Sequence, residues 1–381
     1  MHLIFEITVI LFSSMLAILV SKRIGIPAVV GQLLVGIIVG PTLLDLVHQS
    51  QIIHFLSEIG VILLMFLAGL EANLALLKKY LKPSLLVAIT GVVFPLVIFY
   101  FTTKATGYST QTALFYGIVF AATSVSITVE VLQEYHKLKT RTGAVILGAA
   151  VADDILAVLL LSFFVSSRGA SPHLIMQLVA QFLFLVFLLL AVKYFIPMLY
   201  RLVDKLRFFE MESYLALLIC FAFALMADAV GMSAVIGSFF AGLAIGQTKQ
   251  VMVIEEAISH LGYSFFIPIF FTSIALPLRF DGVLGHIWII ILFTILAVLS
   301  KLLPAYFVGR SFKFNHSDSL TIGGGMVSRG EMALIIVQIG LTAKIISNAV
   351  YSSLVIVVIL STIIAPFILK FSFEEGKPFK K

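Results

Sequence analysis

Long apolar stretches recur along the whole chain, and short polar or basic segments separate them. A stretch of about 18–25 apolar residues is long enough to cross the ~30 Å hydrocarbon core of a bilayer as a helix. The pattern therefore predicts an all-α polytopic membrane protein with thirteen transmembrane helices. Their predicted ranges are 3–20, 26–44, 52–71, 83–103, 112–134, 142–166, 172–197, 211–230, 232–247, 257–277, 284–307, 318–343 and 347–370.

Two of these spans share an internal repeat. Residues 25–42 read GIPAVVGQLLVGIIVGPT and residues 231–248 read GMSAVIGSFFAGLAIGQT, at a constant offset of 206 residues. Seven of the 18 positions are identical, and every glycine of the first segment is retained in the second. A shared preference for small residues in close-packed membrane helices is the alternative, but it does not fix an ungapped register.

The two repeated spans are seven apart in order, so they should cross the membrane in opposite directions. This arrangement predicts two inverted six-helix repeats joined by a linker helix at 172–197. Inverted repeats are typical of secondary transporters, whose substrate sites lie near the bilayer midplane at interrupted helices.

The repeat pairs span 112–134 with span 318–343, and both contain a candidate interruption. The first carries the polar run Ala122–Ser126, and the second carries three consecutive glycines at 323–325. Glycine weakens a helix by about 1 kcal/mol, so the triplet is a candidate unwinding point. We therefore predict crossed broken helices at 112–134 and 318–343. Tight helix contact is the alternative role for the glycines.

Composition agrees with a membrane protein. The 381 residues are 61% hydrophobic and only 12% charged, whereas soluble domains carry about 25% charged residues. The mean hydropathy is +1.15. The net charge of +6 comes from basic residues scattered through short loops, which does not favour a nucleic-acid partner. The single cysteine, Cys220, allows no disulfide within the chain.

The basic residues predict the topology. The predicted spans place most Lys and Arg residues on one side of the membrane, and the other side has only Lys104, Arg168, Arg279 and Lys344. Positively charged loops face the cytoplasm in such proteins. We therefore predict a multi-pass protein of the cell (inner) membrane with its N-terminus outside and its C-terminus in the cytoplasm.

Asp153 and Asp154 stand together inside the apolar run Gly143–Phe164. A carboxylate near the bilayer centre costs about 2.5–3.5 kcal/mol on insertion scales. A second one adds to this cost without improving the packing, so a purely structural role is the weaker interpretation. The pair is best explained as groups that bind and release cations or protons within the membrane.

Four more charged residues lie deep in predicted spans, namely Glu130, Lys301, Arg329 and Glu331. Adjacent helical residues point about 100° apart, so only one of the two aspartates should meet Lys301 while the other faces an aqueous cavity. A structural ion pair or snorkelling is the alternative for Lys301. We expect Arg329 to neutralise Glu331 or Glu130, either as a structural salt bridge or with a direct role in transport.

No cofactor is expected. The eight histidines fall in loops or at span ends without the spacing of metal ligands in a helix. The sequence also lacks a phosphate-binding loop, a nucleophile elbow and a dinucleotide-binding motif, so it does not favour an enzyme or ATP-driven transport.

Five segments resemble the bacterial sodium/proton antiporters of the cation:proton antiporter-2 family, and the likeness covers essentially the whole chain. They are FAATSVSITVEVLQE, ILGAAVADDILAVLLL, FLAGLE, SAVIGSFFAGLAIG and GGGMVSRGEMALI. The glutathione-gated potassium efflux members of this family typically have Gln-Asp at the acidic pair, whereas this chain has Asp-Asp. It is most similar to the short thirteen-helix members.

The resemblance implies roles for individual residues. Asp154 would bind the ion and carry the proton, and Asp153 would pair with Lys301 when no sodium is bound. Thr123 and Ser124 would shape the site at the first crossing. Arg329 and Glu331 would lie at the second crossing, and no role is transferred to Glu130.

The resemblance also implies an assembly. Residues 1–381 would form a single transporter unit that makes a homodimer in the bilayer. Residues 1–80 and 208–280 would form the dimerisation domain, and residues 83–166 and 284–370 the core ion-transport domain. Family members with two acids tend to be electrogenic.

We therefore expect a secondary active antiporter that exchanges cytoplasmic Na⁺ for external H⁺ by alternating access, with Na⁺ held by Asp153 and Asp154. Three alternatives stay open: a K⁺/H⁺ antiporter, a non-transporting membrane ion sensor or receptor on the same fold, and a sodium-coupled transporter of an organic solute. Comparing the response to sodium and to potassium separates a K⁺/H⁺ antiporter from Na⁺ exchange, and the absence of any ion flux would support a sensor or receptor. Accumulation of an organic solute would identify the third alternative.

Overall fold

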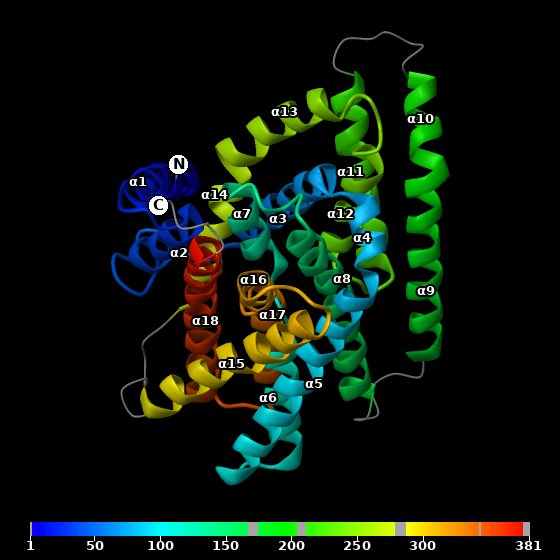
Figure 1. Ribbon diagram of the computed structural model, residues 1–381. Coiled ribbons are helices and arrows are strands. Elements are labelled where there is room, and N and C mark those ends of the chain that lie inside the picture. The colour runs from blue at the N-terminus through cyan, green and yellow to red at the C-terminus, as the bar shows by residue number, and fades with distance from the viewer. Residues whose placement is uncertain (1, 167–173, 204–210, 279–286, 343, 376–381) are drawn as a thin grey trace, which may run out of the picture. The chain divides into compact units, whose positions relative to one another are not determined.

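The computed structural model describes residues 2–166, 174–203, 211–278, 287–342 and 344–375, and within them the ordered secondary structure is helical (Figure 1). The chain divides into two compact units. The first comprises Met1–Gln51, Lys79–Ala157 and Phe271–Lys381, and the second comprises Ile52–Lys78 and Val158–Phe270.

The first unit contains the interrupted helices. Its helices are α1 (His2–Ile24), α2 (Ala28–Val39), α5 (Leu81–Ala105), α6 (Thr110–Ala121), α7 (Val125–Glu134), α15 (Ile287–Ser311), α16 (His316–Gly325), α17 (Glu331–Thr342) and α18 (Asn348–Glu375). Within it, α16 packs against both α15 and α18, while α5 packs against α6 and α15 (Figure 1).

The second unit contains α9 (Leu174–Leu190), α10 (Ile196–Val203), α11 (Met211–Ala229), α12 (Ala234–Ile245) and α13 (Val251–Leu261). A π-helical turn at Ala191–Phe195 joins α9 to α10, and another at Gly262–Phe266 follows α13. Four helices each contain residues of both units: α3 (Gln51–Glu71), α4 (Leu74–Lys79), α8 (Arg141–Ser166) and α14 (Ile267–Ala275).

Among the described residues, nine helical stretches are long and apolar enough to cross a membrane. They are His2–Ile24, Gln51–Glu71, Leu81–Ala105, Thr110–Glu134, Met176–Tyr200, Glu212–Ala229, Val251–Ala275, Ile287–Ser311 and Val350–Glu374. Three apolar helices are shorter: Ala28–Val39, Ala234–Ile245 and Met332–Thr342. The chain is therefore an all-helical polytopic membrane protein.

The repeated segments form shorter helices than the sequence predicted. The predicted spans 26–44 and 232–247 contain α2 and α12, each of 12 residues. Twelve helical residues cover about 18 Å, which is less than the ~30 Å hydrocarbon core. Hydropathy marked the apolar stretch correctly, but it did not mark where the helix within that stretch ends.

Small residues allow α2 to pack closely on its neighbour in the first unit. A Cβ on Gly36 would lie 2.1 Å from the backbone oxygen of Thr272, a distance that no side chain tolerates. The preceding turn is also glycine-dependent, because Gly25 has a φ of +72°. These two positions explain why glycines recur in the first repeated segment.

Two clusters of buried side chains flank the interrupted helices in the first unit. An aliphatic cluster includes Val87, Val145, Ala149, Ala305, Val308, Phe314, Ile322 and Met326. An aromatic cluster consists of Phe99, Tyr116, Phe120 and Phe293, in which the rings of Phe99 and Phe120 stack at 4.0 Å. Both clusters include residues of the interrupted helices, Ile322 on α16 and Phe120 on α6, so this packing fixes the helices in place.

Candidate functional site

The first interruption separates α6 from α7. Helix α6 ends at Ala121, residues 122–124 are not helical, and α7 begins at Val125. Ala122 and Ser124 have extended backbone conformations, with ψ of 137° and 117°. This position agrees with the polar run that the sequence singled out, and it leaves backbone groups at both helix ends without helical partners.

The second interruption lies beyond the glycine triplet rather than within it. Helix α16 includes Gly323–Gly325 as its last turn, and the non-helical residues are 326–330. The prediction that the triplet itself unwinds was wrong, because each glycine packs against a different neighbour. A Cβ would lie 2.7 Å from the Leu302 carbonyl at Gly323, 2.8 Å from Ile368 at Gly324 and 2.7 Å from Ile146 at Gly325.

The two interruptions are hydrogen-bonded to each other. The backbone N–H of Ser124 donates to the carbonyl of Ser328 at 2.8 Å, and the Ser328 hydroxyl donates to the carbonyl of Ser124 at 2.6 Å. The Thr128 hydroxyl donates to the carbonyl of Gly325 at 2.8 Å. All of these side chains are buried. Backbone groups freed by the breaks are thus satisfied within the protein, as non-helical backbone at membrane depth requires.

Gly330 allows this close approach. A Cβ at this position would lie 2.4 Å from the Ser124 hydroxyl oxygen, so any larger residue would push the two breaks apart. Sequence analysis singled out Ser124 but missed Ser328, Thr128 and Gly330. In the segment GGGMVSRG, Ser328 and Gly330 flank Arg329. These two neighbours of a buried arginine were the signal from which their role at the crossing could have been predicted.

Asp153 and Lys301 form a fully buried ion pair. The Lys301 Nζ lies 3.0 Å from Asp153 Oδ1 and 3.3 Å from Oδ2, and both residues are 0% exposed. The pairing of Lys301 with one aspartate that the sequence predicted is present in the structure. Gly91 of α5 adjoins the pair, because a Cβ there would lie 3.5 Å from the lysine nitrogen.

Asp154 follows on the next position of α8 and is 7% exposed. The charges of Asp154 and Arg329 both act on Lys301. Helix α8 also packs on the second interruption, since Ile146 occupies the space beside Gly325. The acidic pair, the lysine and the crossing therefore belong to one electrostatically coupled site.

Arg329 holds backbone carbonyls together. Its guanidinium donates to the carbonyls of Val327 at 3.0 Å, Phe120 at 3.0 Å and Ala297 at 2.8 Å, and it lies over the Phe120 ring. We expected Glu331 or Glu130 as its partner. The Glu331 side chain lies outside the described part of the structure, so its pairing with Arg329 stays a prediction. Two of the three carbonyls, those of Phe120 and Val327, lie beside the helix breaks, where helix ends leave carbonyls that need donors.

The remaining predicted residues are placed as follows. Thr123 is 3% exposed, and its hydroxyl oxygen has no hydrogen-bond partner among the described residues. The Ser124 hydroxyl bonds that of Ser126 at 2.9 Å. Glu130 lies half-buried in α7, away from the break. Glu331 begins α17, and its side chain lies outside the described part of the structure.

The donor set suits a hard monovalent cation or a proton. It offers carboxylate and hydroxyl oxygens beside unwound helix ends, where transporters with discontinuous helices hold Na⁺ and H⁺. No three His, Cys, Asp or Glu side chains gather into a group within the described residues.

Comparisons with known proteins point in the same direction. A model of the family described as "Sodium/hydrogen exchanger, transmembrane" matches residues 9–375. The chain is 46% identical over 356 residues to a Na⁺/H⁺ antiporter of Enterococcus hirae, covering 92% of this chain and 93% of that protein. It is 41% identical over 370 residues to the Na⁺/H⁺-K⁺ antiporter GerN of Bacillus cereus, covering 97% and 96%.

A solved structure shares the fold. The sodium proton antiporter MjNhaP1 of Methanocaldococcus jannaschii superposes with a TM-score of 0.70 and covers 98% of each chain. The sequence identity of this pair is 16%, so the likeness concerns the fold alone.

Proposed function

The chain belongs to the sodium/hydrogen exchanger family and is a Na⁺/H⁺ antiporter, and we propose that it exchanges the two ions by alternating access at Asp154. Sodium and protons compete for this carboxylate. Asp153 serves as a second acid, whose negative charge Lys301 balances while no sodium is bound.

The observation that carries the proposal is the unequal environment of the two aspartates. Asp153 is sealed against Lys301, whereas Asp154 keeps a small exposed fraction of 7%. A carboxylate at this depth is costly to carry uncompensated through the barrier. Loading with Na⁺ or H⁺ removes this cost, so the site crosses when it is loaded and exchange is favoured over leak.

The hydroxyl of Thr123 supports a cation site at the first crossing. Leaving a buried hydroxyl without a partner costs about 1–3 kcal/mol, so native structures rarely keep one without a reason. A sodium ion held by Asp154, Asp153 and oxygens of Thr123 and Ser124 supplies the missing partner. Opening of the Asp153–Lys301 pair would free the Asp153 carboxylate for this ligand set, and the Lys301 ammonium, left buried without its counter-charge, would release a proton and become a neutral amine.

The two acids also support an electrogenic cycle, in which two protons enter for each sodium ion that leaves. Sodium travels outward from the cytoplasm and protons travel inward. This direction rests on the positive-inside prediction, which places the N-terminus outside and the C-terminus in the cytoplasm.

The proposed architecture has thirteen spans in two inverted six-helix repeats with α9 and α10 as the linker. Its support is the repeat itself, because α2 and α12 begin and end at positions 206 residues apart. The glycines that precede them, Gly25 and Gly231, have φ of +72° and +73°. A homodimer is part of this proposal, with residues 1–80 and 208–280 forming its interface and residues 83–166 and 284–370 the moving core.

Asp154→Asn tests the assignment. We expect proteoliposomes with this variant to lose sodium-driven proton flux, because the amide cannot exchange a proton or balance a cation. Asp228→Asn is the matched control, since Asp228 is exposed on α11 in the second unit and its variant should transport normally. Robust flux in Asp154→Asn would refute the central role of this carboxylate.

Potassium exchange is the second candidate, favoured by the relative named as a Na⁺/H⁺-K⁺ antiporter. Proton flux driven by imposed sodium and potassium gradients in the same vesicles separates the two. A response to sodium alone supports Na⁺/H⁺ exchange, and an equal response to both supports an exchanger of broader specificity.

A further inference from the structure

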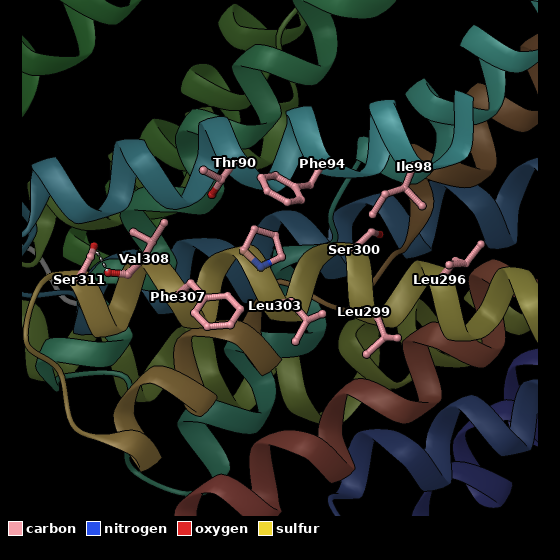
Figure 2. Close-up of a pocket in the computed structure, with 11 residues that line it drawn as sticks. Thr90, Phe94, Ile98, Leu296, Leu299, Ser300, Leu303, Phe307, Val308 and Ser311 are labelled. Atoms are coloured by element: carbon pink, nitrogen blue, oxygen red, sulfur yellow. Dashed lines mark hydrogen bonds between the residues drawn. The ribbon is translucent and has the colours of Figure 1, made fainter. Parts of the chain in front are cut away.

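A second feature of the first unit has no part in ion binding. Helices α5 and α15 enclose an apolar groove of about 540 Å³, and neither Asp153 nor Lys301 is among its lining residues (Figure 2). Figure 2 shows Thr90, Phe94 and Ile98 on α5 across from Leu299, Leu303 and Phe307 on α15. Leu296, Ser300, Pro304, Val308 and Ser311 complete the lining.

The groove offers little to a polar ligand. The hydroxyls of its three polar residues already donate to helix carbonyls, Thr90 to Leu86 at 2.8 Å, Ser300 to Ala297 at 3.2 Å and Ser311 to Val308 at 2.8 Å, so only their acceptor lone pairs remain. The remaining lining residues are apolar. The lining therefore suits a hydrocarbon chain better than a polar solute.

The lining is open to the hydrocarbon around it. Phe94, Leu303 and Phe307 are 48%, 43% and 64% exposed. From Leu296 to Ser311 the groove follows α15 for about 22 Å, at ~1.5 Å per residue. This length exceeds the depth of one leaflet, which is about half of the ~30 Å hydrocarbon core. An extended acyl chain that enters from one membrane surface fits this shape.

One end of the groove is basic. Arg310 lies in the last turn of α15, Lys313 lies two residues beyond its end at Ser311, and Lys82 lies at the start of α5. All three are exposed. The rings of Tyr80 and Phe314 lie 5.7 Å apart and hold the two helix ends together. Basic residues beside a membrane surface attract anionic headgroups.

We propose that the groove binds one acyl chain of an anionic phospholipid whose headgroup phosphate lies against Lys82, Arg310 and Lys313. The site is an apolar channel with a basic end, which matches both parts of such a lipid. The same two helices carry Gly91 and Lys301 on their inner faces. A bound chain therefore supports the spacing of the helices that enclose the ion pair.

The test compares phosphatidylglycerol with phosphatidylcholine of identical acyl chains, titrated into the purified full-length protein and followed by native mass spectrometry. We expect phosphatidylglycerol to bind more tightly. Leu303→Trp should fill the groove and abolish this preference, while Leu183→Trp on α9, at a position that is 60% exposed, should preserve it.

A charge variant tests the basic end independently. Lys82→Gln combined with Lys313→Asn should weaken phosphatidylglycerol binding by about twenty-fivefold and leave phosphatidylcholine unchanged, since each lysine contributes about a fivefold factor. Asparagine is chosen because Lys313 has a φ of +64°. The double variant Lys22→Gln and Lys249→Gln removes two exposed lysines elsewhere and should have no effect.

Equal binding of the two lipids to the wild type would overturn the proposal, as would unchanged binding in both the Leu303→Trp and the charge variant. Either result would identify ordinary lipid contact at an apolar surface. Neither result would bear on antiport, because the measurement is of lipid binding rather than of flux.

Discussion

The two interrupted helices occupy corresponding places in the proposed repeats, yet they are built from different chemistry. The α6–α7 break carries hydroxyls, and one of them, on Thr123, has no partner among the described residues. The α16–α17 break carries Arg329, whose guanidinium is bound to three carbonyls. The first break is suited to accept an ion, and the second is suited to keep the crossing rigid.

This difference teaches that matched backbone geometry does not imply matched function. Carbonyls at both breaks accept from donors within the protein, those of Phe120 and Ser124 at the first and that of Val327 at the second. The difference between the breaks is the Thr123 hydroxyl, which offers an unpartnered oxygen among the described residues. The comparison predicts that substitutions at the second break act on stability, whereas substitutions at the first act on ion affinity.

Arg329→Met should give the largest effect. It removes three charge-assisted hydrogen bonds and leaves buried carbonyls without donors, so we expect a loss of about 3 kcal/mol or more in unfolding free energy. Thermal unfolding in detergent should show a clear fall in Tm. Arg329→Lys keeps the charge but provides a single donor centre, so its stability should be intermediate.

If Arg329→Met instead unfolded like the wild type and lost only sodium affinity, the proposed difference would be wrong, namely that the second break acts on stability and the first on ion affinity. Arg329 would then belong to the ion site itself.

Gly325→Ala should give the next largest effect, a destabilisation of about 1–3 kcal/mol from overpacking against Ile146. If the glycine served to unwind the helix, alanine would instead strengthen α16 by about 1 kcal/mol. The sign of the change in unfolding free energy therefore decides between packing and unwinding.

A double-mutant cycle gives the control for this prediction. Ile146→Val removes the atom that a Cβ at residue 325 would approach at 2.7 Å. The double variant should be less destabilised than the sum of the two single variants. Simple additivity would mean that the two residues do not compete for space.

Thr123→Val should have the smallest effect on stability, because replacing an unpartnered buried hydroxyl by a methyl group of similar shape is neutral or slightly stabilising. Its effect should fall on transport, with KM for sodium raised about tenfold if one ligand worth ~1.4 kcal/mol is lost. Proton flux against sodium concentration in proteoliposomes gives this value.

Thr123→Ser retains the hydroxyl and should keep the wild-type KM. A valine variant with unchanged KM would remove Thr123 from the proposed ligand set, even if the carboxylates keep their roles.

Much of the site was predictable because burying charge in lipid is so costly. Asp153 and Asp154 were conspicuous in an apolar segment, and the need for a partner led to Lys301, which the structure pairs with Asp153. The first break was also predictable, since the polar run Ala122–Ser126 interrupts an otherwise apolar span.

Other features depend on contacts that one sequence does not reveal. Glycines serve both unwinding and close packing, and only the neighbours Leu302, Ile368 and Ile146 show that the triplet at 323–325 packs. Ser328 and Thr128 were missed because hydroxyls in membrane helices usually bond their own helix, as Thr294 does with Ile290. The carbonyl partners of Arg329 come from three separate segments of the chain.

The permanent charge of Arg329 has a consequence for how voltage acts on the protein. A guanidinium stays protonated in proteins, so Asp153, Asp154, Lys301 and Arg329 together carry two negative and two positive formal charges when both acids are ionised. These formal charges cancel, so the membrane field exerts little net force on an empty site, although the local cost of carrying Asp154 without a cation or proton beside it remains. The membrane field is worth about 2.3 kcal/mol per charge per 100 mV, and it acts mainly on the loaded site. A more negative cell interior should therefore speed the step in which the proton-loaded site moves inward.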